Sequence, residues 1–131
     1  MSFDWTQYLF LAQKLTKGSA SSSNQEAMLR SAISRAYYAA FCSARNFLRD
    51  SRKKVIPSTA VAHGIVKEIF GSSTDKIELA IATDLDRLRI DRNKADYNDV
   101  VRGLDPMSEF ALKLCQNIFL NIRTLQNRQQ D

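Results

Sequence analysis

The sequence predicts an all-α protein, a four- to five-helix antiparallel up-and-down bundle, and three observations favour this fold. Its 131 residues suffice for one domain with one core. Only four Gly and two Pro interrupt the chain, which favours a few long elements over many short strands. Apolar residues recur at steps of three and four in five segments, which is the spacing of a helix face. We therefore expect a single helical domain over residues 1–131.

The longest predicted helix lies in the first half of the chain. A first helix covers about residues 5–17, and a serine-rich loop separates it from a second helix over about 25–49. Ser23, with Glu26 three residues later, is a capping-box pattern at the start of the second helix. Alanines four residues apart in this helix allow another helix to approach closely. We expect it to be the centre of the bundle, with these residues inward: Ala32, Ile33, Ala36, Tyr37, Ala40, Phe41, Ala44 and Leu48.

Three further helices are predicted in the second half of the chain. The third follows a basic loop and a proline, and Ser58 or Thr59 is expected to cap it. The fourth has Asp75 as its expected N-cap and repeats apolar residues at helical spacing. The last begins at Asp105 and Pro106, a cap followed by proline in the first turn, and continues almost to the end of the chain.

The net charge of +5 is unevenly distributed. Residues 1–54 hold nine Lys and Arg against three Asp and Glu, whereas residues 55–131 hold ten against eleven. The basic half ends in a cluster with Arg52, Lys53 and Lys54. Such a cluster can bind the phosphates of RNA. A solvated loop without a ligand is the alternative interpretation of the same charges.

A charge-dense segment follows Leu88. If the fourth helix continues through it, Arg92 and Asp96 are i, i+4 neighbours, and Arg89 lies on roughly the same side as Arg92. Arg92 then emerges at the edge of the buried stripe, where a guanidinium can present a fork of donors to a phosphate. The alternative is a helix end in which such ion pairs only stabilise the fold.

Two stretches together resemble the HEPN domain family (higher-eukaryote and prokaryote nucleotide-binding). They are SRAYYAAF at residues 34–41 and LRIDRNKADY at residues 88–97, and their order and separation are similar to those of the family over about residues 5–125. The resemblance implies a helical bundle that usually forms a homodimer. In active members it also implies a metal-independent endoribonuclease, with no cofactor.

The resemblance also implies a cellular setting. Many such proteins are toxins paired with a small nucleotidyltransferase-like antitoxin, or parts of antiviral defence systems. RNA or a nucleotide, and such an antitoxin or another defence-system protein, are therefore the expected partners. We expect a cytoplasmic location and no membrane contact. No apolar run approaches the roughly 18–20 residues of a membrane span, and the N-terminus lacks a signal-peptide pattern.

The chain departs from the signature of the active members. That signature is an Arg, often followed by a polar residue such as Asn, and then a His with four to six residues between. The resemblance therefore implies a catalytic patch of Arg92, Asn93, Asp96 and Tyr97. The positions where the signature has its His hold other residues. After Arg92 they are Tyr97, Asn98 and Asp99, and after Arg89 they are Lys94, Ala95 and Asp96. Histidine suits proton transfer because its pKa is about 6.5. The sequence therefore leaves open whether the chain is an enzyme.

Several other residues carry separate expectations. Arg35 should pair with a carboxylate from another helix and so orient the polar motif, the candidates being Asp84, Asp91 and Asp96. Tyr37 and Tyr38 are expected in the core, and a hydroxyl near Arg92 is the alternative. The only histidine, His63, is expected to be structural or at the surface, with recruitment as a substitute base as the alternative.

The cysteines and the remaining function classes complete the predictions. Cys42 and Cys115 are expected to be reduced, buried thiols, and a disulfide is the alternative. No metal site is expected, because two Cys and one His offer no paired ligand spacing. A catalytically silent dimerisation or interaction protein is the alternative function. A helix-turn-helix DNA-binding protein is disfavoured, since no short helix with base-reading residues stands out.

Overall fold

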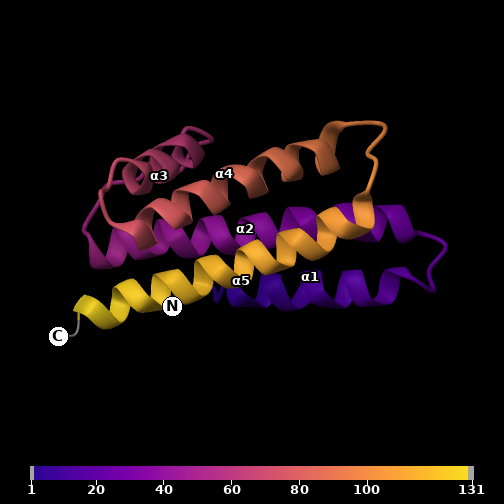
Figure 1. Ribbon diagram of the computed structural model, residues 1–131, viewed down its shortest axis with the longest axis horizontal. Helices are drawn as coiled ribbons and strands as arrows, with labels where there is room; N and C mark the ends of the chain where they lie inside the picture. The colour runs from indigo at the N-terminus through magenta and orange to yellow at the C-terminus, as the bar shows by residue number, and fades with distance from the viewer. Residues whose placement is uncertain (1, 130–131) are drawn as a thin grey trace.

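The computed structural model describes residues 2–129, which form five α-helices packed against one another and contain no strand (Figure 1). The helices are α1 (Thr6–Ser19), α2 (Gln25–Ser51), α3 (Ala62–Gly71), α4 (Lys76–Tyr97) and α5 (Leu104–Gln129). Along the chain α1, α2, α4 and α5 alternate in direction, and the short α3 lies beside the first part of α4 (Figure 1). The prediction of an all-α helical bundle is confirmed.

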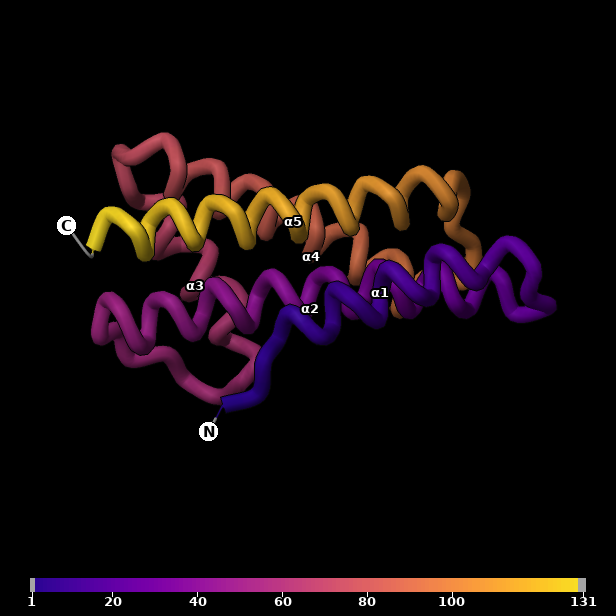
Figure 2. The backbone as a smooth tube through the Cα atoms, turned by 90° about the horizontal axis from the view of Figure 1, so that it is seen from below, coloured from indigo at the N-terminus to yellow at the C-terminus, as the bar shows by residue number. Residues whose placement is uncertain are grey.

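Helix α2 is the centre of the bundle, because it packs against each of the other four helices. Figure 2 shows α1 alongside α2 from a second direction. Ala36, Ala40 and Ala44 are fully buried in α2. Their methyl groups leave room for neighbouring backbones, while larger side chains such as Phe41 and Leu48 fill the space beside them. The predicted role of this helix is confirmed.

One cluster of buried apolar side chains draws on all five helices. Each buried Leu, Ile or Phe contributes about 1.5–3 kcal/mol relative to leaving it exposed. Cys42 and Cys115 are separate free thiols within this cluster, as predicted. Leu88 and Ala95 of α4 are also buried, so the core continues almost to the end of that helix. This packing places the polar C-terminal turns of α4 against α2.

The predicted cap of α4 agrees with the structure, and the predicted start of α5 agrees in part. Asp75 caps α4, and its carboxylate accepts a hydrogen bond of 3.0 Å from the Glu78 N–H. Helix α5 begins at Leu104, so Asp105 lies inside its first turn and is not the cap that the sequence predicts, whereas Pro106 lies in the first turn as predicted. The missing N–H of proline costs nothing there, since the first N–H groups of a helix have no partner within it.

The predicted caps of α2 and α3 are also wrong. Helix α2 begins one residue later than a Ser23 cap requires, and α3 begins after Val61, beyond Ser58 and Thr59. Neither helix has a side-chain cap bond. At α3 the reason is a backbone turn that precedes the helix, in which the Ala62 N–H donates to the Thr59 carbonyl oxygen over 3.0 Å. The backbone carbonyl of Thr59 is thus the acceptor, in place of the Ser58 or Thr59 hydroxyl that the sequence pattern predicts.

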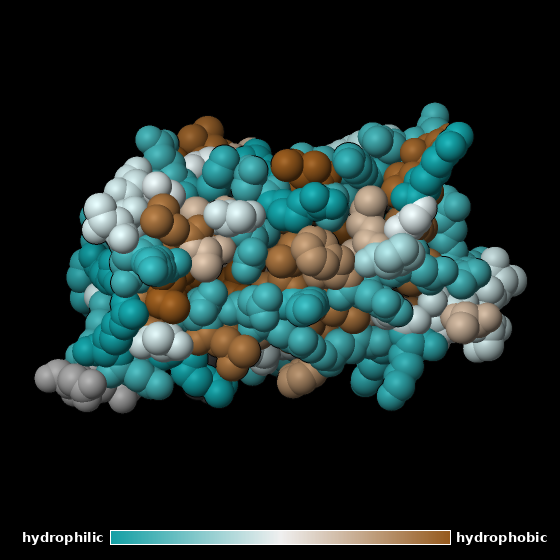
Figure 3. All heavy atoms as spheres, viewed as in Figure 1, coloured by the Kyte–Doolittle hydropathy of each residue, from teal (hydrophilic) through white to brown (hydrophobic). Residues whose placement is uncertain are grey.

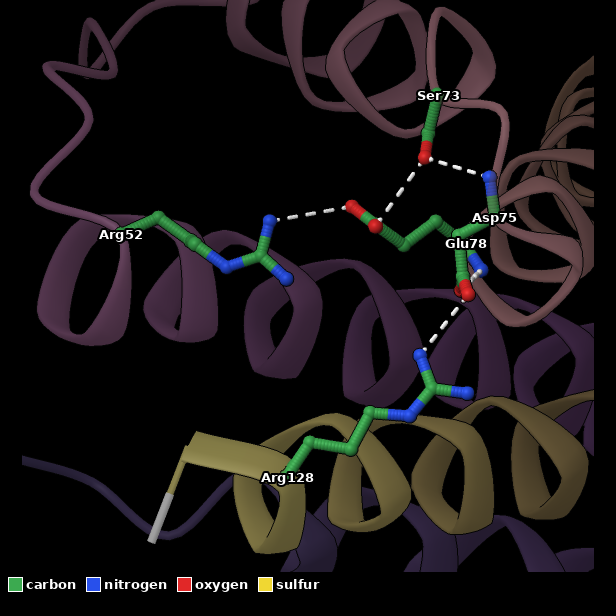
Figure 4. A network of polar contacts seen from close by, with 5 residues as sticks. All are labelled: Arg52, Ser73, Asp75, Glu78 and Arg128. Atoms are coloured by element: carbon green, nitrogen blue, oxygen red, sulfur yellow. Dashed lines mark hydrogen bonds and ion pairs between the residues drawn. The ribbon is translucent and has the colours of Figure 1, made fainter. Parts of the chain in front are cut away.

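A polar network joins the start of α4 to the ends of α2 and α5 (Figure 4). Arg52 donates to Glu78 over 3.2 Å, and Ser73 donates to the other oxygen of that carboxylate over 3.1 Å. Arg128 of α5 donates to Asp75 over 2.9 Å. Each such partly exposed pair contributes at most about 1 kcal/mol. The network therefore positions the turn between α3 and α4 more than it stabilises the fold.

The surface is mixed in character. Figure 3 shows a face that is mostly hydrophilic, with small hydrophobic areas between the polar side chains. Between residues 2 and 129, no helix combines the length and the apolar character that crossing a membrane requires.

Candidate functional site

The charged end of α4 remains helical as far as Tyr97, and an arginine of α2 helps to hold it there. The Arg30 guanidinium donates to the carbonyl oxygens of Ala95 (2.9 Å), Asn98 (2.6 Å) and Asp99 (3.2 Å). The last carbonyls of a helix lack partners within the helix. Arg30 supplies those donors, so the C-terminal turns of α4 are fixed against the N-terminal half of α2.

Three polar neighbours orient the Arg92 guanidinium on these turns. Its Nη2 donates to the Tyr38 hydroxyl over 2.7 Å, and its Nη1 donates to the side-chain oxygen of Asn93 over 3.0 Å. Its Nε lies 2.8 Å from Asp96 Oδ2, an ion pair without the alignment of a hydrogen bond. The Arg92 side chain is 16% exposed. The charge is thus held in one orientation, is partly neutralised by Asp96, and remains partly accessible.

Three tyrosine rings lie around this guanidinium. The guanidinium carbon of Arg92 is 5.0 Å from the ring centre of Tyr38, 5.7 Å from that of Tyr97 and 6.0 Å from that of Tyr37. A cation within about 6 Å of a ring centre is attracted to it. Tyr37 is buried, as predicted, whereas Tyr38 is half-buried with its hydroxyl at Arg92. Tyr97 is 73% exposed, so it adds an open aromatic ring beside the charge.

The structure brings the two motif stretches together. Tyr38 contacts Arg92, and the Ser34 hydroxyl donates to Asp96 Oδ2 over 3.3 Å, so residues 34–41 and 88–97 pack side by side. We call Tyr38, Arg92, Asn93, Asp96 and Tyr97 the α2–α4 patch. All four residues of the predicted catalytic patch belong to it, together with Tyr38, whose hydroxyl lies at Arg92.

His63 reaches the same region from the first turn of α3. Its Nδ1 lies 2.5 Å from the Tyr37 hydroxyl, and its ring stacks on Phe41 with 4.2 Å between the ring centres. The Tyr38 ring lies edge-on to it at 6.1 Å. The sequence predicts a structural or surface role for His63, and no spacing in it signals this position. His63 and Tyr37 meet only because α3 packs onto α2 and α4.

The surroundings of His63 and Tyr37 favour neutral forms of both side chains. Burial lowers the pKa of His63 below its usual 6.5, and the charges of Arg89, Arg92 and Arg45 lower it further. Burial also raises the pKa of the Tyr37 hydroxyl above its usual 10.0. Near neutral pH the pair is therefore an uncharged imidazole hydrogen-bonded to a protonated phenol.

The predicted RNA-binding residues do not form one surface. Arg89 is half-buried and lines a shallow hollow between α3 and α4. Arg52 pairs with Glu78, while Lys53 and Lys54 are exposed. Arg52 contacts Glu78, which lies 14 positions before Arg92 on α4 (92 − 78 = 14). The basic cluster is therefore about 21 Å along α4 from the α2–α4 patch, since a helix rises about 1.5 Å per residue.

The predicted carboxylate partner of Arg35 is wrong. Within residues 2–129 Arg35 forms no ion pair, and its guanidinium carbon lies 5.0 Å from the ring centre of Tyr8 on α1. Asp91 and Asp96 pair with other arginines, and Asp84 has no ion pair in the same range. Arg35 is only half-buried, so water can solvate its charge and it needs no carboxylate.

The described residues form no metal centre, and no known protein that matches the chain identifies the patch. Among residues 2–129, no group of three or more His, Cys, Asp and Glu side chains is placed to hold a metal ion. No protein-family model, no curated protein and no solved structure matches this chain.

Proposed function

We propose that this protein is a HEPN-type module that binds RNA at the α2–α4 patch. The observation that carries the proposal is the Arg92 guanidinium, fixed by Tyr38 and placed beside the exposed ring of Tyr97. A guanidinium binds phosphate oxygens through its fork of N–H donors. An exposed aromatic ring stacks on an unpaired base, at about 1–3 kcal/mol per base. The two side chains together suit a phosphate and its neighbouring base in single-stranded RNA.

The donors of Arg92 are not used up by the protein. A guanidinium has five N–H groups, two on each Nη and one on Nε. One N–H of Nη1 is bonded to Asn93 and one of Nη2 to Tyr38, and Nε faces Asp96. One N–H on each Nη therefore has no partner in the described residues. These two donors are of the kind that a guanidinium gives to phosphate oxygens.

The patch supports binding more strongly than cleavage. Cleavage of RNA without a metal needs a base for the 2′-OH proton and an acid for the leaving oxygen. The motif histidine is absent, and the carboxylate nearest to Arg92, that of Asp96, is held in an ion pair and by Ser34. In a bacterial toxin–antitoxin or defence system, which the resemblance implies, such a module acts with RNA, with a second copy of itself or with an antitoxin.

One observation favours a catalytically silent interaction protein as the second candidate. Tyr97 and Val100, at and beyond the end of α4, are both about three-quarters exposed, at 73% and 75%. Exposed apolar side chains near a neutralised arginine also suit a contact between proteins. RNA binding and self-association therefore need to be measured on the same preparation.

The test is the binding of a fluorescent single-stranded RNA in excess EDTA at low salt. Arg92→Ala should weaken binding at least tenfold, and Tyr97→Ala by a similar factor, because each removes one of the two contacts. Arg123→Ala is the matched control, an exposed arginine on α5 away from the patch, and should change affinity less than twofold. Thermal unfolding verifies that each variant is folded.

Two outcomes decide against the proposal. Folded wild-type protein that binds no RNA at low salt overturns it, and concentration-dependent dimerisation lost in Tyr97→Ala then supports the interaction protein. Equal weakening by Arg92→Ala and Arg123→Ala also overturns it, because binding then depends on net charge alone. Tyr97→Phe keeps the ring and should retain wild-type affinity.

A further inference from the structure

The hydrogen bond between Tyr37 and His63 determines which ring nitrogen of the histidine carries hydrogen. The Tyr37 hydroxyl is buried in a residue that is 1% exposed, and its only partner in the described structure is His63 Nδ1. A buried hydroxyl that donates to nothing costs about 1–3 kcal/mol. The phenolic hydrogen therefore points to Nδ1, which must then be the acceptor. A neutral ring with an unprotonated Nδ1 carries its hydrogen on Nε2.

The groups around the ring keep it neutral. On α2 they are Tyr37 and Arg45, and on α4 they are Arg89 and Arg92. No carboxylate is among the charges that act on His63. An imidazolium here would face three guanidinium groups without a counter-charge, so protonation is opposed.

The remaining nitrogen of His63 and the side chain of Arg89 have no partners within residues 2–129. His63 makes its one side-chain hydrogen bond through Nδ1, and its ring is partly exposed. Arg89 forms no ion pair or side-chain hydrogen bond in the same range. Arg89 also lines the hollow between α3 and α4, together with Gly64, the neighbour of His63. Lys67, Asp86 and Glu68 line it as well, and Lys67 pairs with Asp86 over 3.1 Å. The side chain of Arg89 thus has open space beside it, next to the residue that follows His63.

We propose that His63 is a phosphate-binding donor, which gives its Nε2–H to an RNA phosphate held by Arg89 next to the α2–α4 patch. An imidazole N–H and a guanidinium that have no bonded acceptor both suit a phosphate oxygen. Tyr37 is a positioning residue in this account, because it fixes the tautomer and touches no RNA. The ring presents N–H and not a lone pair to the RNA, so His63 does not take the 2′-OH proton. The inference rests on the proposed RNA binding and adds a second phosphate contact to it.

Nitrogen NMR of protein with ¹⁵N-labelled histidine tests the tautomer directly, since His63 is the only histidine. Near pH 7.5 the spectrum should show a protonated Nε2 and an unprotonated Nδ1. Tyr37→Phe should shift the ring toward a mixture of the two tautomers. A protonated Nδ1 in the wild-type protein would overturn the inference.

RNA binding tests the phosphate contact. His63→Leu should weaken binding of single-stranded RNA about tenfold, the usual effect of losing a hydrogen bond to a charged group. His63→Gln, which keeps an N–H near the Nε2 position, should restore most of the affinity. Arg89→Ala should weaken binding by a similar factor and abolish the RNA-induced shift of the Nε2 signal.

The inference and the proposed function fail in different ways. RNA binding that depends on Arg92 but is unchanged in folded His63→Leu protein overturns the inference alone. Wild-type protein that binds no RNA overturns both. Cleavage of the RNA in EDTA that His63→Gln abolishes also contradicts the inference, because His63 then acts as a proton acceptor.

Discussion

The hydroxyl of Tyr38 on α2 accepts a hydrogen bond of 2.7 Å from the guanidinium of Arg92 on α4. These residues are 54 positions apart and belong to residues 34–41 and 88–97, the two stretches on which the proposed function rests. Buried residues on both helices, among them Leu88 and Ala36, bring them together. The hydrophobic core of the bundle thus determines where the polar patch lies.

Removal of the Tyr38 hydroxyl should weaken both the fold and RNA binding. Tyr38→Phe keeps the ring beside Arg92 but takes away the acceptor of its Nη2. We expect the free energy of unfolding to fall by about 1 kcal/mol, since the bond is partly solvated, and RNA affinity to fall several-fold. Urea denaturation measures the first effect. Tyr97→Phe is the control, because the Tyr97 hydroxyl makes no hydrogen bond in the described residues. Equal stability of Tyr38→Phe and the wild type would contradict a stabilising bond between Tyr38 and Arg92.

Truncation of Arg30 should loosen the end of α4. Arg30→Ala leaves the carbonyls of Ala95 and Asn98 without their guanidinium donor. We expect a loss of about 1–2 kcal/mol in stability and faster hydrogen exchange of the amides near residues 94–98. Arg35→Ala is the matched control on α2 and should leave this exchange unchanged, since Arg35 packs on α1. Unchanged exchange in Arg30→Ala would show that the helix end does not depend on this contact.

The lowered pKa of His63 makes stability depend on pH. Burial lowers the pKa of His63 in the folded protein below the 6.5 of the unfolded chain, and Arg89, Arg92 and Arg45 lower it further. Between the folded and the unfolded pKa, the unfolded chain therefore binds more protons than the folded protein. The stability contribution of neutral His63 is therefore complete above about pH 6.5 and declines as the pH falls toward the folded pKa. Urea denaturation from pH 8 to 5 should show this decline. The His63→Gln variant should lack the part of the decline that His63 causes. If stability falls with pH in parallel in the variant and the wild type, the lowered pKa of His63 is refuted.

The separation of the basic cluster from the α2–α4 patch predicts a dependence on RNA length. A short RNA that covers less than about 21 Å cannot contact both sites at once. The double variant Lys53→Ala/Lys54→Ala should therefore leave the affinity of a short RNA unchanged and weaken that of a long one. For the long RNA, the slope of log affinity against log salt should decrease by about 0.7 for each lost phosphate contact. Equal effects on both RNAs would mean that the two sites act as one surface.

Local patterns in the sequence predicted the helices well, and contacts between distant residues were predicted poorly. Apolar spacing identifies all five helices, because a helix buries one face whatever its neighbours are. The Asp75 cap was predicted correctly because its bond spans only three residues. Arg35 was assigned a carboxylate partner, but its charge reaches water over Tyr8, and sequence spacing does not report that exposure.

The candidate site shows the same division. The i, i+4 pair of Arg92 and Asp96 was predicted, because helical geometry alone places the two side chains together. The position of His63 beside Tyr37 was not, because it depends on how a 10-residue helix packs on two others. His63 thus lies beside Tyr37 and Tyr38, and it reaches them from α3.

The most direct test of RNA binding at the α2–α4 patch is a titration of ¹⁵N-labelled protein with a short single-stranded RNA at low salt. The account predicts saturable chemical-shift changes at residues 34–38 and 89–97, including the Arg92 side-chain signal, while residues 9–15 of α1 remain unchanged. Shifts confined to the basic loop at residues 52–54, or no shifts at all from folded protein, would contradict it.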